Sequence, residues 1–326
     1  MSLLVVLEHD RGAWSEANDE AMTAGRTLAA DMGTDLHAVL IGDGALDLSG
    51  QAAAAGAAVV HVAIHPMLTD FGPEAVGETV VQLIAAATPD AVMAVGTSRG
   101  NEILAQVAAR MDLPFVANCM TISPADDTWS MTRIQWGGSL LEDTTLETDG
   151  PKIVSYGHHA VVAEAPPAPG AGAVQEFTPE LDGSLAHTIV VDRDVQQAGV
   201  TLSTAPVVVS GGRGVGSAEG FDQLEELAEL LGGRVGCSRA VTNLGWRNHT
   251  DQVGQTGTRI APEIYIATGI SGAIQHWVGA MASKRILAIN TDPEANMVVK
   301  ADYAVIADLH KVVPAITAEI KRRKGL

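Results

Sequence analysis

The chain has 326 residues, enough for two domains, and its formal charge of −19 excludes general binding to nucleic acid, whose phosphates would repel it. No apolar stretch reaches the roughly 18 to 20 residues that a membrane span needs, so we expect no membrane insertion. The only two cysteines, Cys119 and Cys237, argue against a disulfide framework and fit a reducing, cytoplasmic location.

The charge is unevenly distributed along the chain. Residues 1–200 carry 27 acidic and 7 basic side chains, whereas residues 201–326 carry 12 and 13, so the net charge is −20 in the first part and +1 in the second. An anionic cofactor would be repelled by the first part and tolerated by the second. The simpler reading stays open, namely that an acidic surface only keeps the first part soluble.

Apolar runs alternate with helical patterns in the first part of the chain. Helical periodicity is present in residues 18–32 and 75–87. The predicted strands are residues 3–7, 36–42, 59–64 and 91–96. This alternation indicates a mostly parallel sheet covered by helices.

A threonine-rich, alternating pattern follows between residues 115 and 156. Its segments 131–135, 144–147 and 153–156 predict an antiparallel hairpin at the edge of the sheet. Residues 165–172 have the proline- and glycine-rich composition of a linker or exposed loop, and little periodicity follows as far as residue 203.

A second alternation of strands and helices occupies the rest of the chain. Predicted strands are residues 206–210, 264–267, 286–289 and 303–307, all expected to be buried, and predicted helices are residues 221–231, 273–281 and 312–321. We therefore predict an α/β protein with an N-terminal, mostly parallel sheet domain in residues 1–203 and a C-terminal doubly wound domain in residues 204–326. In such sheets ligands bind at the carboxyl ends of the strands.

Residues 264–290 predict a strand, a glycine turn, a helix and a second strand, with polar groups only at the joints. Gly269 and Gly272 relax the backbone where the first strand ends, and Ser271 is a predicted N-cap for a helix that begins near Ala273. The free N–H groups of that first turn would face an anion, with His276 close by.

Two further glycine-containing loops are weaker signals when taken alone. Residues 210–214 place Arg213 among glycines after a strand, but a turn of this kind usually binds nothing and lacks the spacing of a dinucleotide fingerprint. Residues 252–257 combine two glycines with amide and hydroxyl side chains, which suits a flat polar ring but also an ordinary surface loop.

Together these segments resemble the alpha subunit of the electron transfer flavoproteins, closely from about residue 205 onward and loosely before it. The resemblance rests on residues 271–276, Gly279 and 288–290, supported by 209–214, 238–240, 252–257, 307–309 and 311–314. It implies that the C-terminal domain binds FAD. The contacts implied are Arg213, Ser238, Arg239, Val253, Gly254, Gln255, Thr256, Ser271, Gly272, Ala273, Ile274, Gln275, His276, Asn290, Asp308 and Leu309.

The resemblance also implies roles for three residues that tune the flavin. Thr256 would reach N5 of the ring, Arg239 would place a positive charge beside it, and His276 would donate to the N1 and C2-carbonyl region where negative charge accumulates. Asn290, Asp308 and Leu309 would hold the adenosine part. Plain structural roles stay open for all of these residues, since His at a helix start and Asn or Asp at strand ends commonly cap and close turns.

The sequence departs from the family pattern in residues 242–249, where Asp is expected in place of Asn243 and often Pro in place of Asn248. This difference bears on the approach to the ring, and hence on its potential, more than on binding.

The resemblance implies an electron carrier rather than a substrate-converting enzyme. A beta subunit would complete a heterodimer, flavin dehydrogenases such as acyl-CoA dehydrogenases would load electrons, and a quinone-linked oxidoreductase would accept them. The alternatives are a bifurcating relative that takes electrons from NADH through its beta subunit, an NAD-dependent enzyme, and a subunit that has lost its cofactor. We predict no metal site, because His158 and His159 lack partners at ligand spacing.

Overall fold

The computed structural model describes residues 2–125, 127–136, 140–168, 170–192 and 200–326. The chain separates into two compact units that divide near residue 194, and each is described by itself. Pro169 of the predicted linker and residues 193–199, just before the second predicted domain, lie outside the described residues.

The first unit is built on a nine-stranded sheet in the order β11-β5-β4-β1-β6-β10-β7-β8-β9. The strands are β1 (Ser2–Val6), β4 (Asp35–Ile41), β5 (Val59–Ala63), β6 (Ala91–Gly96), β7 (Phe115–Ser123), β8 (Thr128–Gln135), β9 (Leu140–Glu147), β10 (Lys152–Gly157) and β11 (Ala173–Phe177). A small hairpin, β2 (His9–Asp10) with β3 (Ala13–Trp14), follows β1. All pairings in the large sheet are parallel except β7 with β8 and β8 with β9.

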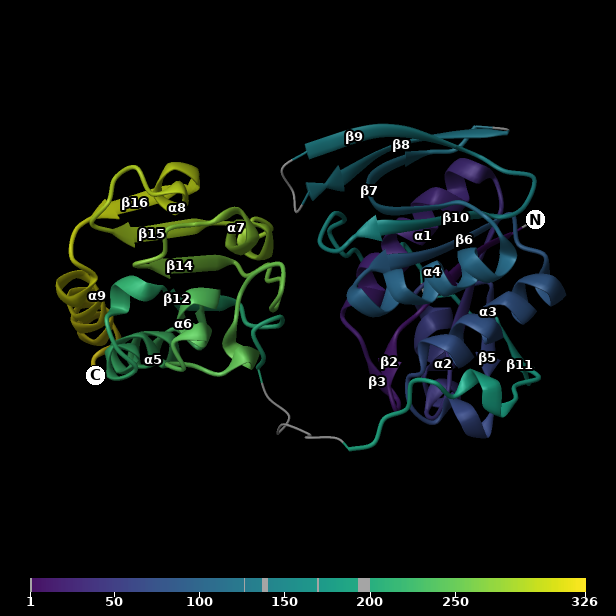
Figure 1. Cartoon of the computed structure of the whole chain (residues 1–326), viewed down its shortest axis with the longest axis horizontal. Helices are drawn as coiled ribbons and strands as arrows, with labels where there is room; N and C mark the ends of the chain where they lie inside the picture. The colour runs from purple at the N-terminus through teal and green to yellow at the C-terminus, as the bar shows by residue number, and fades with distance from the viewer. Residues whose placement is uncertain (1, 126, 137–139, 169, 193–199) are drawn as a thin grey trace. The chain divides into compact units, whose positions relative to one another are not determined.

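Helices cover both faces of this sheet (Figure 1). Successive side chains of β1 alternate between two apolar cores: Leu3 and Val5 pack with α1 (Ala17–Met32) and α2 (Ala45–Ala54), while Leu4 and Val6 pack with α3 (Pro73–Ala87) and α4 (Ser98–Met111). Because both faces are buried, the strand reads as a continuous apolar run rather than an alternating one.

The second unit has a fully parallel five-stranded sheet in the order β13-β12-β14-β15-β16. The strands are β12 (Val207–Gly211), β13 (Arg234–Cys237), β14 (Ile264–Thr268), β15 (Ile286–Asn290) and β16 (Tyr303–Ile306). In chain order this is 2-1-3-4-5, the arrangement of flavodoxin-like doubly wound sheets, in which ligands bind beside the first and third strands.

Helices lie on both faces of this second sheet as well (Figure 1). One core contains residues of α5 (Asp222–Leu230), α6 (Arg239–Asn243) and α9 (Leu309–Lys324), and the other contains residues of α7 (Ile274–Ala280) and α8 (Asn296–Lys300). The predicted fold class is therefore confirmed. None of the described helices is long and apolar enough to cross a membrane.

Several predicted elements are wrong in detail. Residues 153–156 do not belong to the edge hairpin, because β10 is buried and lies between β6 and β7, parallel to both. Strand β11, which pairs with β5 at the other edge, was not predicted because its residues are mostly exposed and show little periodicity. Strand β16 is exposed rather than buried, since it forms the edge of its sheet. Helices α2 and α4 were also not predicted.

Gly272 offers a test of how tightly the second unit is packed. Its φ is +74°, and a Cβ atom there would lie 2.3 Å from the backbone nitrogen of Met297, whereas Gly216, with φ of +88°, has open space around it. We expect Gly216→Ala to lower the free energy of unfolding by about 1–2 kcal/mol through the left-handed backbone alone. Gly272→Ala should cost about 1–3 kcal/mol more, because it adds overpacking. Urea denaturation of both variants measures the difference, and equal losses would contradict it.

Candidate functional site

A cleft of about 440 Å³ lies at the carboxyl ends of the strands in the second unit. It brings together four predicted site residues, Arg213, Ser238, Ser271 and Asn290, which follow or end four different strands. The other lining residues are Gly214, Ala240, Gly269, Ile270, Asp292 and Ala295. This is the position at which a doubly wound sheet binds its ligand, beside the strands where the chain order reverses.

Direct backbone contact closes the floor of the cleft. The N–H of Gly212 donates to the carbonyl of Thr268 at 2.8 Å, and the N–H of Gly214 donates to the carbonyl of Gly269 at 3.1 Å. A Cβ atom on Gly269, whose φ is +60°, would lie 2.8 Å from the Cα of Gly214. Only glycine allows this approach, so the loops after β12 and β14 leave backbone accessible to a ligand.

A row of backbone donors begins beside this floor. Among the described residues, the N–H groups of residues 271–275 have no hydrogen-bond acceptor. The predicted N-cap is wrong: α7 begins at Ile274, its cap position is Ala273, and no side chain caps it. Because Ser271 does not satisfy these donors, they are open to an anion. Ser271, Ala273, Ile274 and Gln275 are all exposed.

The loop after α6 is fastened to α7. Gln255 donates its N–H to the carbonyl of Gln275 at 2.7 Å. A Cβ atom on Gly279 would lie 2.4 Å from the Cα of Gly254, so the loop and the helix pack backbone against backbone. Val253 is buried, while Gln255 and Thr256 are exposed.

One residue of this loop, Gln252, is not among the predicted contacts. It is buried, and its amide accepts from the Thr242 hydroxyl and donates to the Thr256 hydroxyl, both at 2.9 Å. Gln252 therefore orients Thr256, and the available signal was a polar side chain at the start of a glycine-containing loop. Its burial depends on tertiary contacts that the sequence does not display.

His276 is a buried, neutral group in this structure. Its Nε2 lies 2.7 Å from the hydroxyl of Tyr265, and it does not line the cleft. Burial lowers the pKa of His276 to about 4, and the nearby carbonyl of Val253 acts in the opposite direction. Nδ1 of the ring makes no hydrogen bond of normal geometry to the described residues. The ring can therefore donate a hydrogen bond but carries no positive charge near neutral pH.

The residues assigned to the adenosine end of FAD make contacts that close turns and cap a helix, as expected if their role is purely structural. Asn290 donates to the carbonyl of Ile270 at 3.0 Å and accepts from the N–H of Asp292 at 3.1 Å. Asp308 caps α9 by accepting from the N–H of His310 at 3.0 Å, and Leu309 is buried. Arg239 is exposed at the first position of α6 and does not line the cleft itself.

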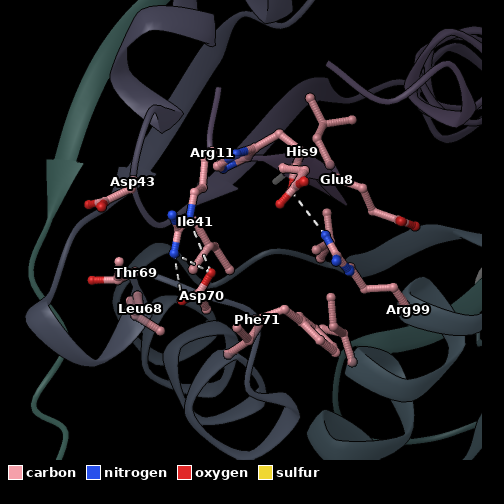
Figure 2. A pocket seen from close by; sticks show the side chains of 15 residues that line it. Glu8, His9, Arg11, Ile41, Asp43, Leu68, Thr69, Asp70, Phe71 and Arg99 are labelled. Carbon is pink, nitrogen blue, oxygen red and sulfur yellow. Dashed lines mark hydrogen bonds and ion pairs between the residues drawn. The ribbon is translucent and has the colours of Figure 1, made fainter. Parts of the chain in front are cut away.

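The first unit has an open cleft of about 910 Å³ beside the starts of β4, β6 and β10, and a much smaller pocket of about 50 Å³ after β1 and β4 (Figure 2). The cationic groups of this pocket contact neighbouring protein groups: Arg11 forms a bidentate pair with Asp70, and Arg99 donates to the carbonyl of His9 at 2.9 Å and lies over the ring of Phe71. Figure 2 shows the contact of Arg11 with Asp70 and the contact of Arg99 with His9 as separate dashed lines. The pocket is too small for a dinucleotide.

The second unit is thus a doubly wound domain with an open, donor-rich cleft for a large anionic cofactor. Comparison with known proteins identifies the family. Residues 201–281 match the electron transfer flavoprotein FAD-binding domain, and residues 3–182 match the electron transfer flavoprotein domain. The chain belongs to the alpha-subunit family of the electron transfer flavoproteins, and its C-terminal domain is an FAD-binding domain.

Relatives named electron transfer flavoprotein subunit alpha align over nearly their whole length. The protein from Mycobacterium tuberculosis is 36% identical over 99% of both chains. The protein from Bacillus subtilis is 33% identical over 98% of this chain and 97% of its own. The protein from Thermoanaerobacterium thermosaccharolyticum is 32% identical over 98% of both.

The buried state of His276 predicts acid sensitivity of the second unit. An unfolded histidine takes up its proton near pH 6.5, whereas the folded ring does so near a pKa of about 4. Between these values the unfolded state binds more protons, so stability is full above about pH 6.5 and falls as the pH decreases towards about 4.

Urea midpoints at about pH 7.5 and about pH 5 measure this effect. We expect a smaller loss on acidification in His276→Asn than in the wild type, and an unchanged loss in His310→Asn, which alters an exposed histidine of the same unit. The same acid-induced loss in all three proteins would show that His276 is not the responsible group.

Proposed function

We propose that this chain is the FAD-holding subunit of a heterodimeric electron transfer flavoprotein, which carries electrons from flavin dehydrogenases such as acyl-CoA dehydrogenases to a quinone-linked oxidoreductase. The observation that carries the proposal is the convergence of Arg213, Ser238, Ser271 and Asn290 on one cleft. Beside it lie five backbone N–H groups that have no acceptor in the part of the chain that the structure describes. Family membership and the names of the relatives support it.

The residues of the cleft fit FAD. Five N–H donors and the exposed guanidinium of Arg213 suit a diphosphate, since aligned backbone donors and arginine are the usual ligands of phosphate oxygens. The near-zero net charge of residues 201–326 tolerates an anionic cofactor. When bound, FAD supplies one- and two-electron redox chemistry that no amino-acid side chain provides.

The protein groups would tune that chemistry electrostatically. The guanidinium of Arg239 is exposed and supplies a permanent positive charge, and the hydroxyl of Thr256 is oriented by Gln252. If the Tyr265 hydroxyl donates to Nε2 of His276, Nδ1 carries the proton and is a neutral donor. We assign the larger electrostatic role to Arg239, because a full charge acts more strongly than a neutral dipole.

The partner proposed for this chain is the beta subunit, because the relatives are named as alpha subunits. We place the complex in the cytoplasm on the basis of the two cysteines, both of which are free and buried. Burial raises the pKa of each thiol to about 12, so neither is a reactive thiolate.

Co-expression with the beta subunit tests the assignment. We expect a one-to-one heterodimer that releases one FAD per heterodimer on acid treatment. Native mass spectrometry and chromatography of the released cofactor measure both quantities. Two FAD per heterodimer would instead support the bifurcating alternative, and recovery of FMN or a nicotinamide nucleotide would overturn the cofactor assignment.

Substitution of Arg239 tests the tuning role. Removing a charge-assisted interaction with the reduced flavin costs about 1.5–3 kcal/mol. For a one-electron couple this corresponds to a drop of roughly 65–130 mV in the first reduction potential, at about 59 mV per tenfold change in equilibrium constant. Potentiometric titration of Arg239→Ala should show this drop with FAD still bound.

Arg285→Ala is the matched control, since Arg285 is also exposed but precedes β15 at the opposite end of the sheet. We expect its potential to equal that of the wild type. If the wild type, Arg239→Ala and Arg285→Ala have equal first reduction potentials, Arg239 does not tune the flavin.

A further inference from the structure

The segment that leaves the first sheet after β10 is fastened along helix α1. The carboxylate of Glu20 lies 2.8 Å from Nδ1 of His159 and also accepts from the His159 backbone N–H at 2.8 Å. Three residues further along the helix, the hydroxyl of Thr23 accepts from the N–H of Glu164 at 3.0 Å. These contacts join residues about 140 positions apart in the sequence.

The prediction that His158 and His159 lack partners is therefore wrong, because the fold brings Glu20 to them. One potential ligand atom from each of Glu20, His158 and His159 lies within 4.8 Å of the other two. The two imidazole rings are stacked, with centroids 3.7 Å apart and an angle of 25° between their planes. All three residues are only partly buried, so an ion could reach them from solvent.

His159 is held in an unusual position for a purely structural side chain. Its φ is +64°, in the left-handed region that side chains other than glycine seldom occupy. Its Nε2 is buried and has no hydrogen-bond partner among the described residues, while Nδ1 is oriented by the Glu20 carboxylate. An ion that replaces this hydrogen bond would take the Glu20 oxygen and Nδ1 of His159 as ligands, which leaves the buried Nε2 outside the coordination of the ion.

The chemistry of the three groups selects the kind of ion. Two imidazoles with one carboxylate suit zinc and neighbouring transition metals, whereas magnesium and calcium prefer sites made of oxygen atoms. Zinc–nitrogen bonds are about 2.0–2.1 Å long, so ligand atoms around one ion lie closer together than 4.8 Å. Because an imidazole binds an ion in the plane of its ring, His158 has to turn out of the ring stack before it and His159 can bind the same ion.

We propose that Glu20, His158 and His159 form a binding site for a divalent transition metal of the zinc type, which clamps the segment after β10 onto α1. The site lies wholly in the first unit, and the inference does not depend on the proposed electron-transfer function. A bound ion would add a further link between two parts of the chain that hydrogen bonds already join. Its role is therefore structural.

Calorimetric titration with zinc chloride tests the site, using the full chain in its co-expressed complex, without an affinity tag and after treatment with chelator. We expect one equivalent of zinc to bind per chain, a large excess of magnesium to leave that binding unchanged, and the thermal midpoint of the first unit to rise with zinc. Competition by magnesium, or the absence of a stoichiometric site, would overturn the proposal on the wild-type protein alone.

Variants identify the ligands. Glu20→Gln keeps an oxygen that can accept from the His159 N–H, so the backbone contact survives while the anionic ligand is lost. We expect Glu20→Gln and His158→Ala each to weaken zinc binding by about 10–100-fold and to abolish the rise in thermal midpoint. His187→Ala, an exposed histidine of the same unit, should bind like the wild type. Wild-type affinity in both site variants would overturn the assignment of these ligands.

Discussion

Contact between two stretches of bare backbone is the constraint on which the cofactor site depends. Where β12 and β14 end, the chain of residues 212–214 touches the chain of residues 269–270, and a side chain at any of the three glycines there would collide with the opposite backbone. The two hydrogen bonds between these loops fix their separation. Arg213 and the donor row at residues 271–275 are covalently adjacent to this contact, so their positions follow from it.

The electrostatic potential of the cleft depends on which nearby side chains are charged in the folded protein. His276 lies against Tyr265 in the core, and burial keeps its imidazole neutral. Positive potential must then come from the exposed Arg213 and Arg239 and from the N–H groups of residues 271–275, which have no acceptor among the described residues. The partial charges of these N–H groups do not depend on pH. The site therefore keeps its affinity for an anion over a wide range of pH, provided that the domain stays folded.

Much of the fold was predictable because the central strands are apolar on both faces and leave long, continuous runs in the sequence. Prediction failed where burial is decided by distant partners. Strand β10 is a central strand, but its sequence resembles the neighbouring hairpin, and β11 is an edge strand whose exposed residues carry no periodic signal. In the site, the family resemblance named the four cleft-lining residues, and each of them lies at or just after the end of a strand. The burial of His276, the anchoring by Gln252 and the meeting of Glu20 with His159 depend on contacts that no local pattern encodes.

The two units also differ in what occupies the point at which the chain order of the sheet reverses. In the first sheet the chain order reverses between β1 and β6, and α4 begins there with Thr97 as its N-cap. The carboxylate of Glu8 occupies this place, 2.5 Å from the Thr97 hydroxyl, and burial raises its pKa. The acidic group at the helix start of the first unit is thus the protein's own side chain. In the second unit none of the described carboxylates accepts from the N–H groups of residues 271–275, and the equivalent position is left for a cofactor. The net charges of −20 and +1 in the two parts of the sequence agree with this division.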